Sequence, residues 1–334
     1  MVKLGHGGID MKIGRRDFLK AAAGAAGLVI SDKVQAMASR SNMDSKIYKI
    51  ERRKLGKTGA EVSIIGMGGI VVMNLEQQDA NKIVADAFER GINYFDVAPS
   101  YGDAQLRLGP ALKPWRDKCF LACKSGKRDR AGVEAEIKES LNALETDHFD
   151  LYQLHGITDV VKDVDAALGK GGAMEAIIEA KKNGVVRNIG FSAHSPEAAI
   201  AAMRKFDFDT ILYPVNFGSH YKSGFECEVV SEAKRRGMGI LAIKAMMKGT
   251  ATENSKKKHP KCWYEPIDDP GLVRLALSWT LGQGVSACLP PGDENLFGMA
   301  LGMAGDLRPL TKDEQRQLEE VAKGLEPAFP IASV

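Results

Sequence analysis

Four titratable side chains stand at or just beyond the ends of three successive apolar runs, where plain packing would favour other residues. They are Asp96, Tyr101, Lys124 and His155. In a parallel α/β barrel the C-terminal ends of the strands share one face, and that face carries the chemistry. We therefore expect these four side chains to meet at one site.

Together the four groups suit proton transfer beside a redox cofactor. Asp96 is expected to be ionised and to pair with Lys124, whose charge would lower the pKa of Tyr101 from its usual value of about 10. Such a tyrosine can give a proton to a developing alkoxide or take it back, while His155 holds the substrate oxygen. No nucleophile with an adjacent base accompanies them, which points to a borrowed cofactor that carries the electrons.

Each of these residues also has a purely structural interpretation. Asp96 and Lys124 could form only a buried ion pair. Tyr101 could be a packing aromatic with a satisfied hydroxyl, and His155 a hydrogen-bonded structural histidine. For any one residue alone this interpretation would prevail. Four such residues at the correct ends of consecutive strands favour a site.

Apolar strands alternate with helical patterns along most of the chain. We expect strands at residues 62–65, 92–96, 119–124, 149–155, 186–191, 210–213, 239–243 and 285–289. We expect helices at 77–90, 104–112, 133–144, 173–183, 196–205, 225–236, 271–281 and 293–303, and a C-terminal one capped by Thr311. Eight strands with helices between them predict a single-domain (β/α)₈ TIM barrel over residues 52–330, with a small hairpin at 52–60.

The first 38 residues have the layout of an export signal. Arg15 and Arg16 precede an apolar run at 21–30 that is too short to span a bilayer, and small residues suited to cleavage follow it. This order predicts a twin-arginine signal peptide over 1–38, then a flexible linker over 39–51. We expect the twin-arginine machinery to export the protein, which would be periplasmic or secreted. A frayed amphipathic helix is the disfavoured alternative.

The composition gives no case for several other classes of partner. With 46 basic and 43 acidic residues the net charge is +3, so no nucleic acid is expected. The basic cluster at 256–261 is interpreted as a solvated loop. No other segment approaches membrane-spanning length, and we expect no stable membrane insertion. The five cysteines form no C-x-x-C pair, so we expect packing roles and no metal site.

The segment 246–269 is too long to be an idle connection between a strand and a helix. Long loops on the active face of a barrel usually cover a site. We expect this segment, together with 218–222, to roof the pocket. Tyr221, Trp263 and Tyr264 there suggest room for an apolar or sugar-like group, although each could equally be loop packing.

Longer motifs resemble the aldo-keto reductase family from about residue 53 to residue 322. They are Asp96-x-Ala98-x-x-Tyr101-Gly102, Leu108-Gly109, Ala122-x-Lys124, the run from Ser140 to His155, and Gly184-x-x-Arg187-x-Ile189-Gly190-x-Ser192. The resemblance implies a (β/α)₈ barrel that binds NADP(H) or NAD(H) and reduces aldehydes or ketones through a tetrad. Its members would be Asp96, Tyr101, Lys124 and His155. Hydride would leave nicotinamide C4 for the carbonyl carbon while Tyr101 protonates the oxygen.

The resemblance also implies cofactor contacts, and this chain departs from several of them. The candidate contacts are Gly68, Ser192, His194, Asn216, Lys244, Gly292 and Asn295. His194 stands near a position where the family commonly has asparagine, Leu212 stands where glutamine is usual, and Lys244 lies where a nicotinamide-stacking aromatic is common. Residues 290–295 contain no base for a 2′-phosphate, and their acids would repel one and could favour NAD(H).

Three functions stay open at this point. We favour an exported NAD(P)(H)-dependent oxidoreductase acting on a small carbonyl or alcohol, because a pure binding module needs no acid/base tuning. The second is a non-catalytic or weakly catalytic nucleotide-binding or sensing barrel, which the altered cofactor contacts and the export route would suit. The third is a barrel isomerase or lyase that uses the same acid/base pair without external redox.

Overall fold

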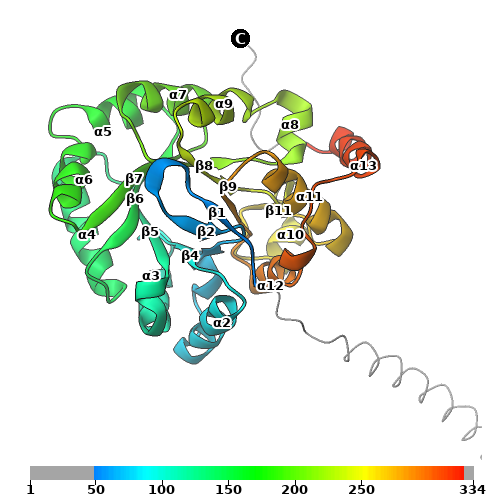
Figure 1. Ribbon diagram of the computed structural model, residues 1–334, viewed down its shortest axis with the longest axis horizontal. Coiled ribbons are helices and arrows are strands. Elements are labelled where there is room, and N and C mark those ends of the chain that lie inside the picture. The colour runs from blue at the N-terminus through cyan, green and yellow to red at the C-terminus, as the bar shows by residue number, and fades with distance from the viewer. Residues whose placement is uncertain (1–48, 327–334) are drawn as a thin grey trace, which may run out of the picture. The chain divides into compact units, whose positions relative to one another are not determined.

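The structure, a computed structural model, describes residues 49–326, and these form a parallel barrel (Figure 1). The barrel strands are β3 (Met67–Gly68), β4 (Tyr94–Asp96), β5 (Phe120–Ser125), β6 (Phe149–Ile157), β7 (Val186–Ala193), β8 (Thr210–Pro214), β9 (Gly239–Ile243) and β12 (Ala287–Leu289). Neighbouring strands pair in parallel in this order. A parallel bridge between Ile65 and Cys288 connects the two ends of the sheet. The predicted (β/α)₈ fold is confirmed.

Helices cover the outside of the barrel in a ring (Figure 1). They are α2 (Gln77–Glu89), α3 (Ala104–Leu112), α4 (Arg130–Ala143), α5 (Ala166–Leu168), α6 (Ala173–Lys182), α7 (Pro196–Lys205), α8 (Phe217–Ser223), α9 (Cys227–Arg235), α11 (Pro270–Gly282), α12 (Glu294–Gly302) and α13 (Lys312–Lys323). Short helical turns accompany them: η1 (Gly56–Thr58), η2 (Gly69–Val72), η3 (Lys113–Lys118), η4 (Val160–Asp165) and η5 (Ala304–Asp306). Thr311 caps α13 in a capping box with Glu314, as the sequence indicates.

The first barrel strand differs from the prediction. The apolar run at 62–65 is expected to form it, but β2 (Glu61–Ser63) pairs antiparallel with β1 (Arg52–Lys54) in a hairpin. The barrel strand is instead the segment Met67–Gly68, just beyond that run, and it pairs with β4. Leu55 and Val62 of the hairpin region are fully buried in the cluster that fills the barrel, so the hairpin helps to seal its interior.

Alternation along the strands sends one set of side chains into the barrel and the other toward the helices. The inward set includes Tyr94, Phe120, Ala122, Leu151, Leu212, Leu241, Ala287 and Leu289. Steps of two residues from Tyr94, Ala122 and Leu151 reach the inward positions at the mouth of the barrel. Those positions are occupied by Asp96, Lys124 and His155. The strand period therefore explains why these three residues of the predicted tetrad converge, while Tyr101 follows β4 in the turn before α3.

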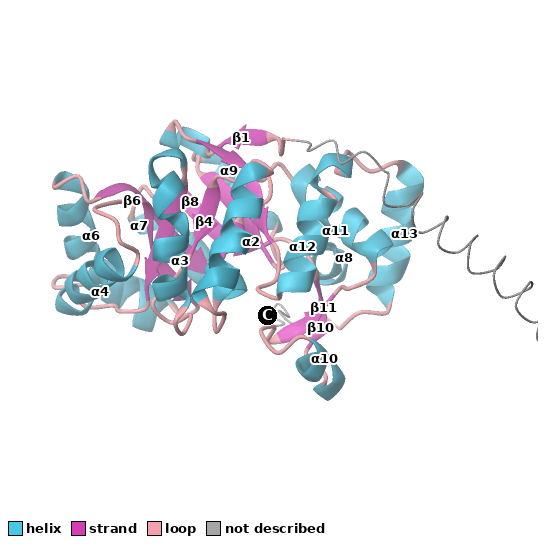
Figure 2. Cartoon of the chain, turned by 90° about the horizontal axis from the view of Figure 1, so that it is seen from below, coloured by secondary structure: helices cyan, strands magenta, loops and turns pink. Residues whose placement is uncertain are grey.

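The chain between β9 and α11 folds into a compact excursion, which we call the mouth segment (residues 247–266). Its strands β10 (Met247–Thr250) and β11 (Tyr264–Pro266) pair antiparallel, and α10 (Glu253–Lys258) lies between them in sequence (Figure 2). Two basic residues tie it to the barrel. Lys261 donates hydrogen bonds to the Val71 carbonyl at 3.0 Å and to Glu294 at 2.6 Å. His259 is 5% exposed and lies 3.1 Å from Asp293, so the interpretation of this cluster as a solvated loop is wrong for these two residues.

The predicted signal peptide lies outside the described residues, as does most of the predicted linker at 39–51. Within the described part of that linker, Ile50 is buried and its amide donates to the Arg90 carbonyl at 3.1 Å. Across residues 49–326, no helix has both the length and the apolar character needed to cross a bilayer.

Candidate active site

A pocket of about 330 Å³ opens at the C-terminal mouth of the barrel. All four predicted tetrad residues line it. Of the predicted cofactor contacts, those that line it are Gly68, Ser192, His194, Lys244 and Gly292. The volume lies within the range of typical small-molecule sites.

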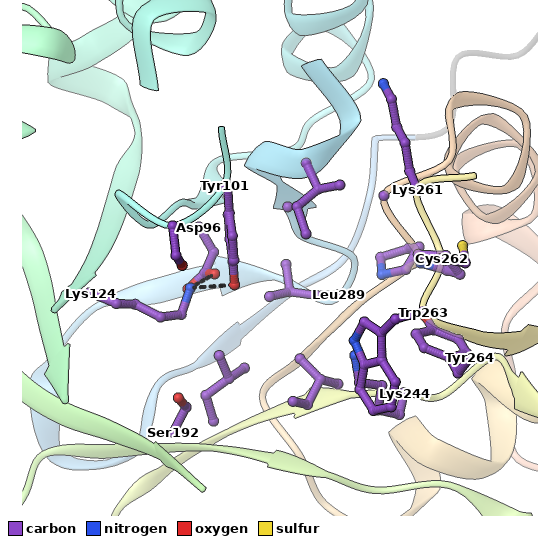
Figure 3. A pocket seen from close by; sticks show the side chains of 18 of the residues that line it. Asp96, Tyr101, Lys124, Ser192, Lys244, Lys261, Cys262, Trp263, Tyr264 and Leu289 are labelled. Atoms are coloured by element: carbon purple, nitrogen blue, oxygen red, sulfur yellow. Dashed lines mark hydrogen bonds and ion pairs between the residues drawn. The ribbon is translucent and has the colours of Figure 1, made fainter. Parts of the chain in front are cut away.

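Asp96 and Lys124 form a buried ion pair beside Tyr101 (Figure 3). The lysine side chain is fully buried and the carboxylate is 2% exposed. The carboxylate also accepts hydrogen bonds from the Tyr94 hydroxyl at 3.2 Å and from the Gln153 amide at 3.1 Å. These contacts hold the carboxylate in place, and the carboxylate in turn holds the Lys124 ammonium. The ammonium also donates a hydrogen bond to the Tyr101 hydroxyl at 3.4 Å.

Burial and charge set the protonation states of this pair and of the phenol. Burial alone would lower the pKa of Lys124, but the charge of Asp96 outweighs it, so the pKa is raised and the lysine is cationic. The prediction that the pKa of Tyr101 is lowered is wrong. Burial raises it, and the opposing charge of Lys124 only partly offsets that effect. Tyr101 therefore keeps its proton at neutral pH, as a proton donor must.

His155 faces Tyr101 edge-on from the end of β6. The two ring centroids lie 5.7 Å apart with an interplanar angle of 85°. Burial, followed by the charge of Lys124, lowers the pKa of His155 to about 3. The imidazole is therefore neutral at pH 7 and can donate one hydrogen bond from a ring nitrogen. Its backbone carbonyl accepts from Arg128 at 2.8 Å, which holds this end of the strand.

The rest of the wall offers a polar donor and an open glycine surface. The Ser192 hydroxyl oxygen accepts from the Gly156 amide at 2.7 Å, which leaves its own proton available to a ligand. Burial, followed by the charge of Lys244, lowers the pKa of His194 to about 4. A Cβ at Gly68 would meet no atom within 4 Å, so open space lies over this backbone. At Gly292 a Cβ would instead lie 2.3 Å from Ile70, so packing requires glycine there.

Asn216 and Asn295 do not line the pocket. The Asn216 side chain caps α8 by accepting from the Ser219 amide at 2.8 Å. Asn295 is exposed in the first turn of α12. The predicted roof at 218–222 is part of α8, and none of its residues lines this pocket. The Tyr221 ring packs against Trp279, with the two ring centroids 6.3 Å apart.

The mouth segment supplies much of the outer wall, which confirms that it covers the site. It contributes Lys261, Cys262, Trp263 and Tyr264. Lys261 and Cys262 were not expected in this wall, although they lie at the junction of the basic cluster and the two aromatic residues Trp263 and Tyr264. Because Lys261 pairs with Glu294, and because Asp293 caps α12, the acids after the eighth strand have partners. The electrostatic case for NAD(H) is weaker as a result.

Potential metal ligands cluster away from this pocket. In the described part of the chain, one such group has its ligand atoms within 4.8 Å of one another, and its members are His220, Glu226 and Cys227. The imidazole already forms a 2.6 Å hydrogen bond with the carboxylate. This hydrogen bond accounts for the close approach of His220 and Glu226.

Comparisons with known proteins agree with this geometry. The sequence profile of the Aldo/keto reductase family matches residues 64–323. The chain is 32% identical over 309 residues to "Uncharacterized oxidoreductase YqkF" of Bacillus subtilis (strain 168), a match that covers 82% of this chain and 97% of that protein. It is 28% identical over 312 residues to L-galactose dehydrogenase of Arabidopsis thaliana, covering 84% and 95%. The solved aldo-keto reductase AKR11C1 from Bacillus halodurans (holo form) shares the fold, with a TM-score of 0.64, 22% identity, and coverage of 81% and 96%.

Proposed function

The chain belongs to the aldo/keto reductase family, and we propose that it is an NAD(P)(H)-dependent oxidoreductase that reduces an aldehyde or ketone to an alcohol, or runs the reverse reaction. One observation carries this proposal. The Tyr101 hydroxyl lies 3.4 Å from the Lys124 ammonium, which Asp96 holds in place, at the wall of one pocket. This arrangement makes a phenol a proton donor whose conjugate base meets a fixed positive charge.

The proton chemistry follows from the positions and charges of the four side chains. A carbonyl oxygen placed between Tyr101 and His155 would accept hydrogen bonds from the phenol and from the neutral imidazole. The nicotinamide cofactor, when bound, supplies the hydride for the carbonyl carbon. As negative charge grows on the oxygen, Tyr101 transfers its proton to it, and Lys124 stabilises the phenolate that remains. In the reverse direction the same phenolate removes the proton from an alcohol.

The wall of the pocket fits a nicotinamide cofactor in two respects. The open space over Gly68 lets a flat group approach the backbone closely. The Ser192 hydroxyl has a proton available for the carboxamide oxygen. These two residues, with His194 beside them in the lining, would hold the cofactor, and either NAD(H) or NADP(H) is compatible with the donors present.

We also propose that the enzyme acts outside the cytoplasm. The order of Arg15, Arg16 and the apolar run at 21–30 supports export by the twin-arginine machinery. This route carries proteins that are already folded, so the cofactor would be bound before export. The small carbonyl or alcohol substrate would then be met in the periplasm or outside the cell.

Turnover of a carbonyl panel tests the proposed reaction. The purified protein is mixed with NADH or NADPH and with small aldehydes and ketones, and the loss of the reduced cofactor's absorbance is followed. Alcohol formed in equal amount to the oxidised cofactor is the expected result. Cofactor binding without turnover across the panel would instead indicate a sensing barrel. Proton exchange on a hydroxy-carbonyl without added cofactor would indicate an isomerase or lyase.

A further inference from the structure

Lys244 occupies a corner of the pocket that the proposed proton chemistry does not use. Its ammonium lies 4.4 Å from the centroid of the Trp263 ring and 4.5 Å from that of Tyr264. Figure 3 shows this group on the other side of the pocket from Tyr101 and Lys124. Contact with two aromatic rings favours one position of the ammonium, so the positive charge has a defined location.

The wall of the pocket has more lysines than acids. Among the described residues that line the pocket, Asp96 is the one with an acidic side chain, and it forms an ion pair with Lys124. Lys261 has Glu294 as its partner. Of the lysines in the lining, Lys244 is the one for which the described residues 49–326 provide no acidic partner. An excess of positive charge in a cleft attracts anions.

The backbone at Lys244 gives a second and independent indication of use. Its φ is +67°, a left-handed conformation that side-chain-bearing residues seldom adopt and that glycine adopts without strain. The turn is closed by a 2.9 Å hydrogen bond from the Met247 amide to the Lys244 carbonyl. A lysine kept in a strained position, with its side chain in a pocket, points to a role for that side chain.

Other titratable groups face Lys244 from the elements around it. They are Lys124 on β5, His155 on β6, His194 after β7, and Cys262 on the mouth segment. Burial, with a smaller contribution from the charge of Lys124, lowers the pKa of Lys244 to about 8. The ammonium form still predominates at pH 7. A bound anion would relieve the repulsion between the two lysines.

We propose that Lys244 binds the oxyanion of an anionic carbonyl substrate, so that the enzyme acts on an oxo acid or an acidic sugar. This inference rests on the proposed function and replaces the expected cofactor role of Lys244. The ammonium would donate hydrogen bonds to a carboxylate or phosphate, while Trp263 and Tyr264 pack against the carbon chain. Cofactor phosphates carry the same chemistry, and the two sources are separated below.

Matched substrate pairs test the preference for an anion. Succinic semialdehyde is compared with butanal, glyoxylate with acetaldehyde, and glucuronate with glucose. We expect kcat/KM to favour the acid of at least one pair by roughly tenfold or more, the value of one charge-assisted hydrogen bond. Lys244→Met, which keeps the chain length between the rings, should abolish this preference mainly through KM, and Lys244→Arg should retain most of it. Lys248→Met, at an exposed lysine paired with Glu265 at 2.9 Å, is the control and should behave as wild type.

Cofactor titration separates the two sources of the oxyanion. If Lys244 holds the substrate, the Kd values of NADH and NADPH should be the same in Lys244→Met as in wild type. The proposal is overturned if the wild type turns over these pairs without a preference for any acid, or if Lys244→Met keeps the preference. It is also overturned if this variant loses cofactor affinity, since the cofactor's phosphates would then be the ligand.

Anion binding at Lys244 can be measured by fluorescence in the absence of turnover. Because Trp263 lies next to the ammonium, succinate should change its fluorescence, whereas uncharged succinamide should not. The change should be absent in Lys244→Met and in Trp263→Phe. If no carbonyl is turned over but the succinate signal still depends on Lys244, the proposed reaction fails and the anion site stands. Absence of the succinate signal overturns the anion site, whatever the activity.

Discussion

Replacing Lys124 by methionine perturbs the ion pair on which the candidate site is built. Lys124 is fully buried and its partner Asp96 is 2% exposed. Without the ammonium, the carboxylate keeps only the neutral donors of Tyr94 and Gln153. Breaking a buried pair by removing one partner costs about 3–5 kcal/mol, because it leaves an uncompensated buried charge. We expect that loss at neutral pH for Lys124→Met, and a similar loss for Asp96→Asn.

The double variant separates the pair interaction from the loss of each side chain. Asp96→Asn with Lys124→Met leaves neither charge of this pair, so the double variant should lose much less stability than the sum of the two single losses. A coupling energy of at least about 3 kcal/mol is expected. The control is Lys113→Met, which removes an ammonium 2.7 Å from Glu145 at a site where both side chains are exposed. It should change stability by less than about 1 kcal/mol.

Urea unfolding of the wild type and the four variants, followed by circular dichroism and by tryptophan fluorescence, measures these quantities. The activity of the single variants should fall as well, since each removes part of the support for the Tyr101 phenolate. If the two single variants each lose no more stability than Lys113→Met, or if their losses add in the double variant, the buried pair does not have the role assigned to it.

Three further predictions follow from single features. The pKa of His155 is about 3 in the folded state and about 6.5 in the unfolded state. Between these pH values only the unfolded protein binds the proton, so the free energy of unfolding decreases as the pH falls. His155→Gln has no such group, so at about pH 4.5 it should avoid roughly 2 kcal/mol of that decrease. Thermal unfolding at several pH values measures this difference, and a variant with the same pH profile as the wild type would contradict it. Gly68→Val places a side chain in open space at an ordinary backbone conformation, so the melting temperature should change little. The side chain would occupy the space proposed for the cofactor, so calorimetry should show weaker cofactor binding. Undiminished affinity would show that Gly68 is not part of the cofactor site. Replacement of Arg15 and Arg16 by lysine should retain the protein in the cytoplasm, as judged by cell fractionation, and normal export of that variant would argue against a twin-arginine signal.

Helices with clear start signals were predictable from the sequence. The bounds of α3 and α7 match the expectation, and Ser195 caps α7 directly before its first-turn proline. The short α8 was missed because two turns give too little periodicity to recognise. The Asn216 amide oxygen caps that helix, a structural role that the spacing of the motifs does not indicate.

The first barrel strand was not predictable, because the run at 62–65 could pair either with the hairpin strand or with the barrel. Contacts with residues far away in the sequence decide between the two. The apolar run at 62–65 suits a hairpin and a barrel strand equally well. The hairpin with β1 takes up residues 61–63, and the bridge between Ile65 and Cys288 connects the sheet ends just after it. Local patterns carry no information about such long-range contacts.

The positions of the four tetrad residues followed from strand ends, but their protonation states did not. The direction of the Tyr101 pKa depends on how deeply the phenol is buried, which no spacing reveals. The partner of Lys261 likewise depends on how the mouth segment folds back onto α12. Sequence therefore located the four residues of the candidate site, and only the structure showed the positive character of the opposite wall.

Single-turnover hydride transfer in Tyr101→Phe tests the central claim most directly. The hydroxyl contributes one long hydrogen bond, at 3.4 Å to Lys124, so its loss should change stability by about 1 kcal/mol or less and leave cofactor affinity intact. If Tyr101 is the proton donor, the rate of cofactor oxidation by a bound carbonyl should fall by roughly 10²–10⁴-fold. A variant that binds cofactor normally and transfers hydride at the wild-type rate would contradict the account.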